Sequence, residues 1–516
     1  MYDNGVRNTL DSLLVADPDV MDRDQLAGFV SQLGRVRNWR AAGEVRVGCC
    51  VVDRWWTLLV EGCPDCVWAG NDLWGDALIR RRSGCRCCIC GGNGEVLGRT
   101  FGVRHQTFID DSTEPSGEPN QPSNGNPPDH PIDNTFNRIA DTTGDLVSVA
   151  SLPPHLELDA AAGTVTVSGG LRYASVAAFV HERGYALHNL GSLPHISVAG
   201  ACATGTHGSG VSNGILGTAV RGLEMMTADG ELVRLRAGDP PLAGAVVALG
   251  ALGVVTRLTL AVEPTFEVQQ VVYDDLPHAE LLAGLVQVLG SAYSVSAFTD
   301  WRDPLGWQVW RKQRVGEASR EWTGGTAADG PRHPVPGVDP VHCTEQLGVP
   351  GPWHERLPHF RREFTPSSGE ELQSEYLVPL ERGRAALEAV ADVRSLIAPV
   401  LLVSELRAIA ADDLWLSPAQ GRDSLAIHFT WAPDADAVAP VVAAVEAALA
   451  PFAARPHWGK VFGVEPEVVR GLYPRWADFA ELLDTYDPAG RLRGDFVGAF
   501  FPTSGGVSPS RGPLRG

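Results

Sequence analysis

The chain has 516 residues and more acidic than basic side chains, 62 against 42, which gives a formal net charge of −20 at pH 7. This length allows two or three domains, each with its own core. The negative charge excludes a nucleic-acid-binding protein, whose partner needs a basic surface, and opposes binding to an anionic membrane. Asp and Glu interrupt any apolar run in the first thirty residues, and no unbroken run of about 18 apolar residues follows. We therefore expect a cytoplasmic protein.

Three segments lack the apolar periodicity of folded structure. Residues 1–62 form an N-terminal extension of unclear structure, with a helix predicted only at 24–33. Residues 106–134 contain six prolines and no Lys or Arg, so they cannot bury enough apolar surface to fold and are predicted to be a disordered insertion. The tail at 501–516 is rich in Gly, Ser and Pro, and we expect it to be flexible.

Cysteine is concentrated in one short stretch, where eight of the ten cysteines lie between Cys49 and Cys90. Two C-x2-C pairs separated by 18 residues satisfy the template of a zinc ribbon: Cys63 with Cys66, and Cys85 with Cys88. The alternative is a damaged stretch of sequence, because residues 80–90 show neither strand alternation nor helical periodicity. We predict no metal site and keep a zinc-binding protein as an alternative.

Strands and helices alternate between residues 135 and 265. Runs rich in β-branched residues predict strands at 146–150, 164–168, 231–235 and 254–262. A helix is predicted near 242–252 and another at 173–183, where Val176, Phe179 and Val180 share one face and Gly184 follows as the C-cap. This mixture predicts an α+β domain.

A glycine-rich stretch at 191–210 is almost free of charged side chains and contains Ser192, Ser197, Thr204 and Thr206. Such a loop lets backbone N–H groups come close to a polyanionic ligand, because glycine has no Cβ to block the approach. It is neither a dinucleotide fingerprint nor a phosphate loop, since both glycine patterns are absent. Composition alone leaves a ligand-binding loop and a structural glycine-rich turn as equal alternatives.

Two strands of a second α+β unit, from residue 266 to about 451, carry polar side chains. At 401–409 a period of two places Glu405 and Arg407 on one face, together with Leu401, Val403 and Ile409. At 424–431 Ser424, Ala426, His428 and Thr430 face one way, and four large apolar residues face the other. A structural ion pair and a hydrogen-bonded core histidine are the alternatives to a binding site.

Residues 191–210 resemble the flavin-binding segment of the vanillyl-alcohol-oxidase superfamily, and are similar to that of the bacterial alditol (xylitol-type) oxidases. The resemblance covers residues 135–500 almost continuously, with two further islands, W-A-G-N at 68–71 and G-V-R-H at 102–105. It implies an α+β fold with a two-subdomain FAD-binding domain of the vanillyl-alcohol-oxidase type at 63–265, interrupted by the insertion, and an α+β substrate (cap) domain at 266–500.

The resemblance also implies FAD as the cofactor. The residues expected to hold it are Gly102, His105, Ser192, Ser197, Gly200, Ala201, Cys202, Ala203, Thr204, Val254 and His457. His105 matches the family's flavin-linking histidine. The family's continuation after this histidine reappears only at 135–145, so the insertion separates His105 from it.

The motifs E-x-R, H-x-T and H-W-G-K match the substrate-binding pattern of the alditol oxidases. By this resemblance the hydroxyls of a polyol bind to Ser192, Glu405, Arg407, Thr430 and Lys460. His428, Lys460 and Arg407 are the expected catalytic residues. His428 is the preferred proton acceptor because an imidazole titrates near neutral pH. Lys460 and Arg407 are expected to stabilise the developing alkoxide.

The implied reaction is oxidation of the terminal CH–OH of a polyol to an aldose, with oxygen reduced to hydrogen peroxide by a monomeric enzyme. One alternative is a sugar-lactone oxidase or dehydrogenase of the same superfamily. Another is a defective oxidase that no longer holds FAD, because residues 72–134 depart from the family pattern. The third is the zinc-binding protein described above.

Overall fold

The computed structural model describes residues 136–142, 146–318, 324–363 and 371–503. Before them it gives only the backbone of five short strands: β1 (Cys50–Val52), β2 (Trp55–Thr57), β3 (Cys66–Val67), β4 (Arg80–Arg81) and β5 (Gly102–Arg104). Several predictions lie outside the described residues: the helix at 24–33, the cysteine side chains of the zinc template, His105, the insertion at 106–134 and most of the tail.

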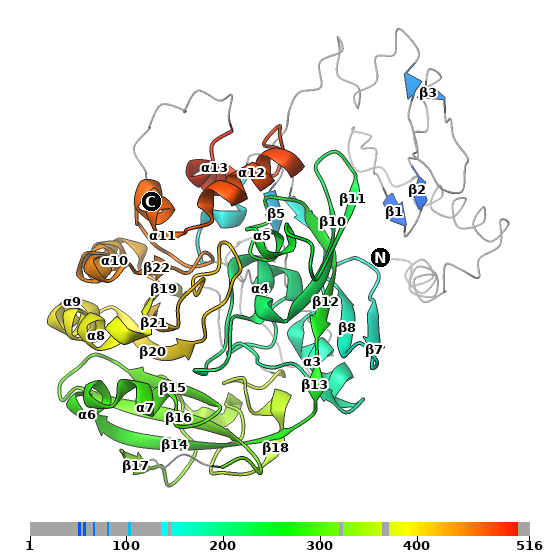
Figure 1. Cartoon of the computed structure of the whole chain (residues 1–516). Coiled ribbons are helices and arrows are strands. Elements are labelled where there is room, and N and C mark those ends of the chain that lie inside the picture. The colour runs from blue at the N-terminus through cyan, green and yellow to red at the C-terminus, as the bar shows by residue number, and fades with distance from the viewer. Residues whose placement is uncertain are drawn as a thin grey trace, which may run out of the picture. The chain divides into compact units, whose positions relative to one another are not determined.

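The chain divides into two compact units, residues 1–98 and 99–516. In the first unit β1 pairs with β2, and β3 with β4, both antiparallel. The second unit holds the other described strands, in two large sheets and two small pairs (Figure 1). One small pair joins β5 in parallel to β6 (Leu146–Ser148), with Gly102 opposite Leu146. The other joins β9 (Tyr185–Ala186) to β13 (Glu263–Pro264).

The first large sheet has five antiparallel strands in the order β11-β10-β12-β8-β7. Their bounds are β7 (Leu156–Asp159), β8 (Thr164–Ser168), β10 (Val220–Met226), β11 (Leu232–Arg236) and β12 (Val254–Ala261). The strands predicted at 146–150, 164–168, 231–235 and 254–262 are confirmed within two residues. Val254, a predicted cofactor residue, is the first residue of β12 and pairs with Met226.

Three helices accompany this sheet: α3 (Tyr173–His181), α4 (Val198–Thr204) and α5 (Leu242–Val246). The helix predicted at 173–183 is confirmed, with Val176 and Val180 buried in the core. The helix predicted near 242–252 ends early at Val246. Leu249 and Gly250 have φ of 56° and 75°, and this left-handed backbone cannot continue a right-handed helix.

The second large sheet has nine strands, eight of them in the order β17-β14-β16-β15-β20-β21-β19-β22, with β18 paired to β14. The bounds are β14 (Glu267–Pro277), β15 (Ser294–Thr299), β16 (Gly306–Arg314), β17 (Thr326–Ala327), β18 (Gly351–Pro352), β19 (Leu372–Pro379), β20 (Leu401–Ile409), β21 (Ser424–Trp431) and β22 (Arg455–Pro456).

Helices cover one face of this sheet, and Figure 1 shows them beside its strands. They are α6 (His278–Ala283), α7 (Leu285–Leu289), α8 (Gly383–Asp392), α9 (Arg394–Ile397) and α10 (Ala435–Leu449). The predicted alternation at 424–431 is confirmed, because Leu425, Ile427, Phe429 and Trp431 all pack into the core beneath these helices. The polar side chains of β21 are therefore on the opposite face of the sheet.

The prediction that Leu401 shares the face of Glu405 and Arg407 is wrong. Leu401 packs into the helix-covered core together with Leu406, whereas Val403 packs with residues of the other face. The register of β20 against β21 shifts between Leu401 and Val403, and such an irregularity turns the side chains before it to the other face.

One stretch, Ala435–Phe452, is long and apolar enough to cross a membrane by length and composition alone. It consists of α10 and the turn that follows. Val438, Val442 and Val445 pack into the core of the second sheet, and Glu446 accepts a hydrogen bond of 2.8 Å from the Tyr376 hydroxyl. A core helix of a soluble protein meets the same criteria, so this stretch carries little weight as a membrane segment.

The C-terminal helices leave the second sheet and pack in the core of the first. They are α11 (Pro466–Leu472), α12 (Trp476–Tyr486) and α13 (Asp495–Phe500). Phe479, Leu483 and Phe500 belong to the same core as Val167 and Leu223 of the five-stranded sheet. The same core contains Trp415 and Trp458 of the predicted cap domain at 266–500, so the C-terminal helices are buried against residues of both predicted domains.

Candidate functional site

The glycine-rich stretch at 191–210 lies against the helix-free face of the second sheet. The Gly210 amide donates to the carbonyl oxygen of Ala408 in β20 at 2.8 Å, and the Ser192 carbonyl accepts from the His359 amide at 3.1 Å. Asn189 and Asn213 both donate through their side-chain amides to the Ser209 carbonyl, which fixes the end of the stretch. The sequence therefore brings its polar loop to the polar face of the sheet.

The middle of this stretch is not a loop, as the sequence analysis expected, but the helix α4. Ser197 caps the helix by accepting from the Gly200 amide at 3.2 Å, and Gly205 ends it with φ of 75°. The amides of Val198 and Ala199 donate to other backbone carbonyls. Its first-turn donors are thus already bonded, so they do not supply the N–H groups that we expected to meet a polyanion.

The predicted cofactor residues of α4 lie inside the protein. Gly200, Ala201, Cys202, Ala203 and Thr204 are all buried, and the Cys202 thiol contacts the Tyr173 hydroxyl at 3.6 Å. Their side chains are short and uncharged, and they do not by themselves offer polar groups to a ligand.

Donors without partners lie instead in the half-buried segment just before α4. Within the described residues, the amides of Ser192, Leu193 and His195 donate to no group, and Nδ1 of His195 is buried without a partner. A Cβ placed on Gly191 would lie 3.7 Å from side-chain atoms of Ile196 and Thr206, which is ordinary van der Waals contact. The free amides that follow Gly191 fit the phosphate and carbonyl oxygens of FAD.

Three charged or titratable residues lie side by side on the polar face of the sheet. Glu405 in β20 is directly opposite His428 in β21, and His428 is opposite Glu375 in β19. Directly opposed residues of neighbouring strands project from the same face. Glu405, His428 and Glu375 therefore form one buried line of side chains, which we call the polar row.

Arg407 joins the polar row to Ser192. Its Nε donates to Glu405 Oε1 at 2.6 Å, and its Nη2 donates both to Glu405 Oε2 and, at 2.7 Å, to the Ser192 hydroxyl. This planar two-point contact is the geometry in which a guanidinium holds a carboxylate most firmly. The predicted substrate residues Ser192, Glu405 and Arg407 are thus brought together.

Lys460 joins the other end of the polar row. Its Nζ lies 2.5 Å from Glu375 Oε2 and 2.8 Å from His428 Nδ1, and the other ring nitrogen of His428 lies 3.0 Å from the Thr430 hydroxyl. Since Lys460 donates to Nδ1, the neutral ring carries its proton on Nε2 and donates it to Thr430. Lys460, His428 and Thr430 therefore share the face that holds Ser192 and Arg407.

Three residues of this site were not predicted from the sequence: Glu375, His207 and His359. Glu375 is a single acidic residue in a strand whose pattern predicted nothing, although a charge at an inward position of a sheet is a usable signal. His207 belongs to the T-H-G-S-G end of the glycine-rich stretch, and His359 lies in the segment that follows β18. His359 Nε2 lies 2.9 Å from Glu405 Oε1.

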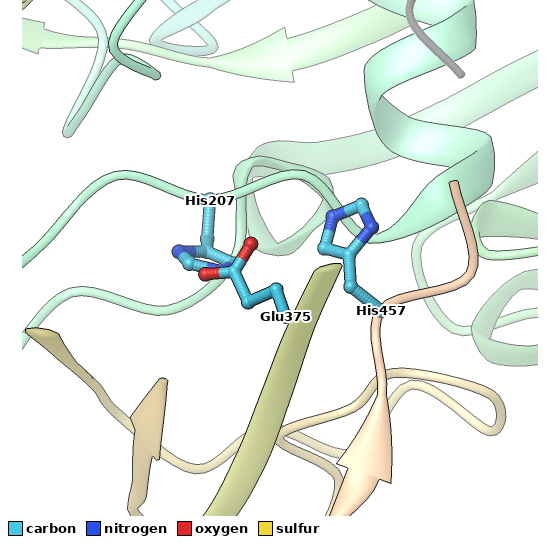
Figure 2. A group of neighbouring side chains, drawn as sticks. All are labelled: His207, Glu375 and His457. Carbon is cyan, nitrogen blue, oxygen red and sulfur yellow. The ribbon is translucent and has the colours of Figure 1, made fainter. Parts of the chain in front are cut away.

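Glu375, His207 and His457 form a buried group whose ligand atoms all lie within 4.8 Å of one another (Figure 2). Figure 2 shows the Glu375 carboxylate directed toward the His207 ring, at 3.1 Å from Nε2 but without hydrogen-bond geometry. His457 Nδ1 accepts from the Gly459 amide at 3.1 Å, so its other nitrogen carries the proton. With Lys460 already on Glu375, this donor set does not suit a metal ion.

Burial and neighbouring charges shift the pKa values in the polar row. Burial alone would raise the pKa of Glu375, but Lys460 and His207 hold it well below its usual range. Burial would also raise the pKa of Glu405, and Arg407 and His359 likewise lower it well below that range. Burial, with Lys460 adding to it, lowers the pKa of His428 to about 4. His428 is thus neutral at neutral pH, which contradicts our premise that it titrates there.

We expect acid to destabilise the folded protein between about pH 6.5 and pH 4. Burial lowers the pKa of His428 and of His359 to about 4, whereas a histidine in the unfolded chain binds its proton near pH 6.5. In that window the unfolded state holds more protons, so stability falls as the pH falls. Unfolding temperatures of the holoenzyme measured from pH 7 to pH 4 check this. His428→Asn should flatten the decline, and an unchanged slope would contradict it.

Family models match two parts of the chain. The model described as "FAD binding domain" matches residues 134–236, and the model described as "D-arabinono-1,4-lactone oxidase" matches residues 369–499. The first match contains Ser192 and α4, and the second contains the polar row, Arg407 and Lys460.

Characterised relatives cover most of the described chain. The chain is 52% identical over 367 residues to alditol oxidase from a Streptomyces species. The matched region covers 70% of this chain and 88% of that protein. The chain is 30% identical over 381 residues to L-gulono-1,4-lactone dehydrogenase from Mycobacterium tuberculosis, covering 69% and 85%.

Solved structures support the fold. A variant of cholesterol oxidase from Brevibacterium sterolicum matches with a TM-score of 0.58 at 12% identity, over 71% of this chain and 88% of that one. 6-Hydroxy-D-nicotine oxidase from Arthrobacter nicotinovorans matches with a TM-score of 0.53 at 15% identity, over 69% and 82%. The predicted α+β fold with an FAD-binding domain is confirmed.

Proposed function

Because this chain belongs to the alditol oxidase family of FAD-dependent enzymes, we propose that it oxidises the terminal CH–OH of a polyol to an aldose and reduces oxygen to hydrogen peroxide. The observation that carries the proposal is the polar row. It joins Ser192 and Arg407 at one end to Thr430 and Lys460 at the other, on one face of one sheet. FAD, held by the FAD-binding domain, supplies the two-electron oxidation.

A polyol is a neutral ligand that presents several hydroxyl groups, and each of them needs both a donor and an acceptor. Glu405 supplies a carboxylate acceptor, Arg407 and Lys460 supply charged donors, and the hydroxyls of Ser192 and Thr430 can act as either. Glu405 and Arg407 are buried, and Ser192, Thr430 and Lys460 are partly buried, so water competes weakly with the substrate at the charged groups. This set suits a sugar alcohol better than an apolar alcohol.

Lys460 and Arg407 have a second task in the reaction. Loss of the hydroxyl proton leaves negative charge on the substrate oxygen, and fixed cations in a water-poor site stabilise that charge strongly. Lys460 Nζ donates to His428 Nδ1, the only unprotonated nitrogen of that ring. We therefore propose two linked proton transfers. Lys460 Nζ gives the proton of its hydrogen bond to His428 Nδ1, and Nζ takes up the proton of the substrate hydroxyl.

The second candidate is oxidation of a sugar lactone, which the match of residues 369–499 to a D-arabinono-1,4-lactone oxidase model favours. A lactone presents a ring and fewer hydroxyls than an alditol. An open-chain polyol fits the site better. It can place one hydroxyl at Glu405 and Arg407, at one end of the polar row, and another at Thr430 and Lys460, at the other end.

Compartment and oligomeric state are part of the proposal. The net charge of −20 supports a protein that stays in solution and away from anionic surfaces. We propose a monomeric, cytoplasmic enzyme. Size-exclusion chromatography with light scattering would contradict the monomer if the mass were twice 55.1 kDa.

A peroxide assay with purified protein tests the proposed function. We expect turnover with xylitol and sorbitol to exceed turnover with L-gulono-1,4-lactone at least tenfold in kcat/KM, which corresponds to about 1.4 kcal/mol. Equal or higher kcat/KM for the lactone would favour the second candidate. The visible spectrum before and after acid precipitation shows whether flavin is bound and whether it is covalent. Colourless protein would contradict both candidates.

A further inference from the structure

Two buried residues behind the substrate site are not needed for contact with a polyol, yet they are bonded to one another and to Glu405. We propose that Lys312 and His359 are positioning residues, in which Lys312 fixes the ring proton of His359 and His359 fixes the carboxylate of Glu405. This inference rests on the proposed function, since it assumes that Glu405 binds a substrate hydroxyl.

Lys312 is a fully buried cation in the middle of the second sheet. It lies in β16, opposite Gln270 of β14 and Ser294 of β15, and its exposed fraction is 1%. Its Nζ lies 2.5 Å from the carbonyl of Leu357, 3.0 Å from that of Pro358, and 3.1 Å from His359 Nδ1. An ammonium has three protons, and these three acceptors use all of them.

The third of these bonds decides the state of the imidazole. Because Nδ1 of His359 accepts from Lys312, the neutral ring carries its proton on Nε2, which donates to Glu405 Oε1 at 2.9 Å. Arg407 Nε donates to the same oxygen at 2.6 Å. With Oε1 occupied by two donors, Oε2 is left with Arg407 Nη2 and a free lone pair for a substrate hydroxyl.

Without Lys312 the ring can place its proton on either nitrogen. The tautomer with a proton on Nδ1 would turn an unprotonated Nε2 toward Glu405 Oε1, and two acceptors at hydrogen-bond distance repel each other. The carboxylate would then rotate away from the position in which it meets the substrate. The expected consequence is weaker polyol binding, with little change in the chemistry at the reacting carbon.

The arrangement also makes polyol binding sensitive to pH. The charged or titratable groups that face Lys312 are Glu405 and Arg407 from β20, together with His359 and Cys343 from the segment after β17; Gln270 and Ser294 are neutral. Burial lowers the pKa of Lys312 to about 7, although Glu405 opposes this effect. Above that pH the amine has two protons for three acceptors, so we expect the KM for polyol to rise as the pH passes about 7.

The test compares Lys312→Met with Arg311→Met in the holoenzyme. Arg311 is the next residue of the same strand, and is also buried, but it bonds Ser291 on the helix-covered side. We expect Lys312→Met to raise the KM for xylitol about tenfold with kcat nearly unchanged, and to abolish the rise of KM near pH 7. Arg311→Met should lower stability and leave KM unchanged. His359→Gln keeps an N–H near the position of Nε2, so its KM for xylitol should stay closer to the parent value than the KM of His359→Leu.

Nuclear magnetic resonance of the holoenzyme with ¹⁵N-labelled histidine tests the same relay without any substrate. The His359 signal, identified by its loss in His359→Gln, should show a proton on Nε2 in the parent and a mixture of tautomers in Lys312→Met. A parent ring protonated on Nδ1, or a Lys312→Met variant with altered tautomers but unchanged KM, would overturn the proposal. A parent with the expected tautomer and no polyol oxidation would contradict the proposed function instead.

Discussion

Replacing Lys460 by methionine is expected to slow the reduction of bound FAD by xylitol by about 10²–10³-fold, the usual effect of removing one preorganised donor from a transition state. Its Nζ is the cation between Glu375 Oε2 and His428 Nδ1, and methionine fills much of the same volume without a charge. Rapid mixing under anaerobic conditions, at saturating xylitol, measures this step directly. Flavin content should stay at the parent level.

The same variant leaves Glu375 buried without its ammonium, which costs roughly 3–5 kcal/mol of folding stability. Adding Glu375→Gln removes the uncompensated charge, so the double variant should recover stability but not the rate. Arg314→Met is the control, since Arg314 lies in the same sheet as Glu375 and its replacement breaks an ion pair of 2.6 Å with Glu263 of β13, away from the polar row. Flavin reduction in Lys460→Met within threefold of the parent would refute the assigned role.

Replacing Arg407 by methionine is expected to lower both stability and kcat/KM. The guanidinium is the main counterion of the buried Glu405 and the group that holds the Ser192 hydroxyl. An uncompensated buried carboxylate costs about 3–5 kcal/mol, which corresponds to a fall in unfolding temperature of roughly 3–5 °C in a chain of this size. We expect kcat/KM for xylitol to fall by about 10²-fold or more, because two substrate contacts are disturbed together.

Arg407→Lys separates charge from geometry. An ammonium keeps the positive charge but cannot hold both oxygens of Glu405 and the Ser192 hydroxyl in one plane. Stability should therefore recover in part, while kcat/KM stays at least tenfold below the parent. The double variant Arg407→Met with Glu405→Leu should regain stability with no activity. If Arg407→Lys were as active as the parent, the two-point contact would have no role in the reaction.

The predictions that succeeded depended on patterns within single elements. The alternation at 424–431 placed His428 and Thr430 on one face, and burial of Phe429 and Trp431 on the other confirms it. The helix at 173–183 and the strands of the first sheet follow from apolar periodicity in the same way. The position of Leu401 was wrong, because a register shift depends on the partner strand and not on the residues themselves.

Such local patterns could not predict which charged residues of the site pair with one another. Glu375 is far from His207 and from Lys460 in the chain. The pairing of β19 with β22 brings Lys460 to Glu375, and the packing of the glycine-rich stretch on the sheet brings His207. His359 and Lys312 likewise meet through the packing of a loop on a strand. The helix α4 was mistaken for a loop because glycine lowers the intrinsic helix propensity of this stretch, whereas the burial of every residue of α4 in the folded protein overrides it.

The sequence by itself determined the family, the cofactor class and the face that His428 and Thr430 share, because motif spacing and a period of two are local properties of the chain. Only the tertiary structure decided which charges neutralise one another and which groups are protonated. Those states depend on burial and on neighbours from distant segments. His428 is neutral because the folded sheet removes it from water, whereas Glu375 is ionised against the effect of burial because Lys460 and His207 lie beside it.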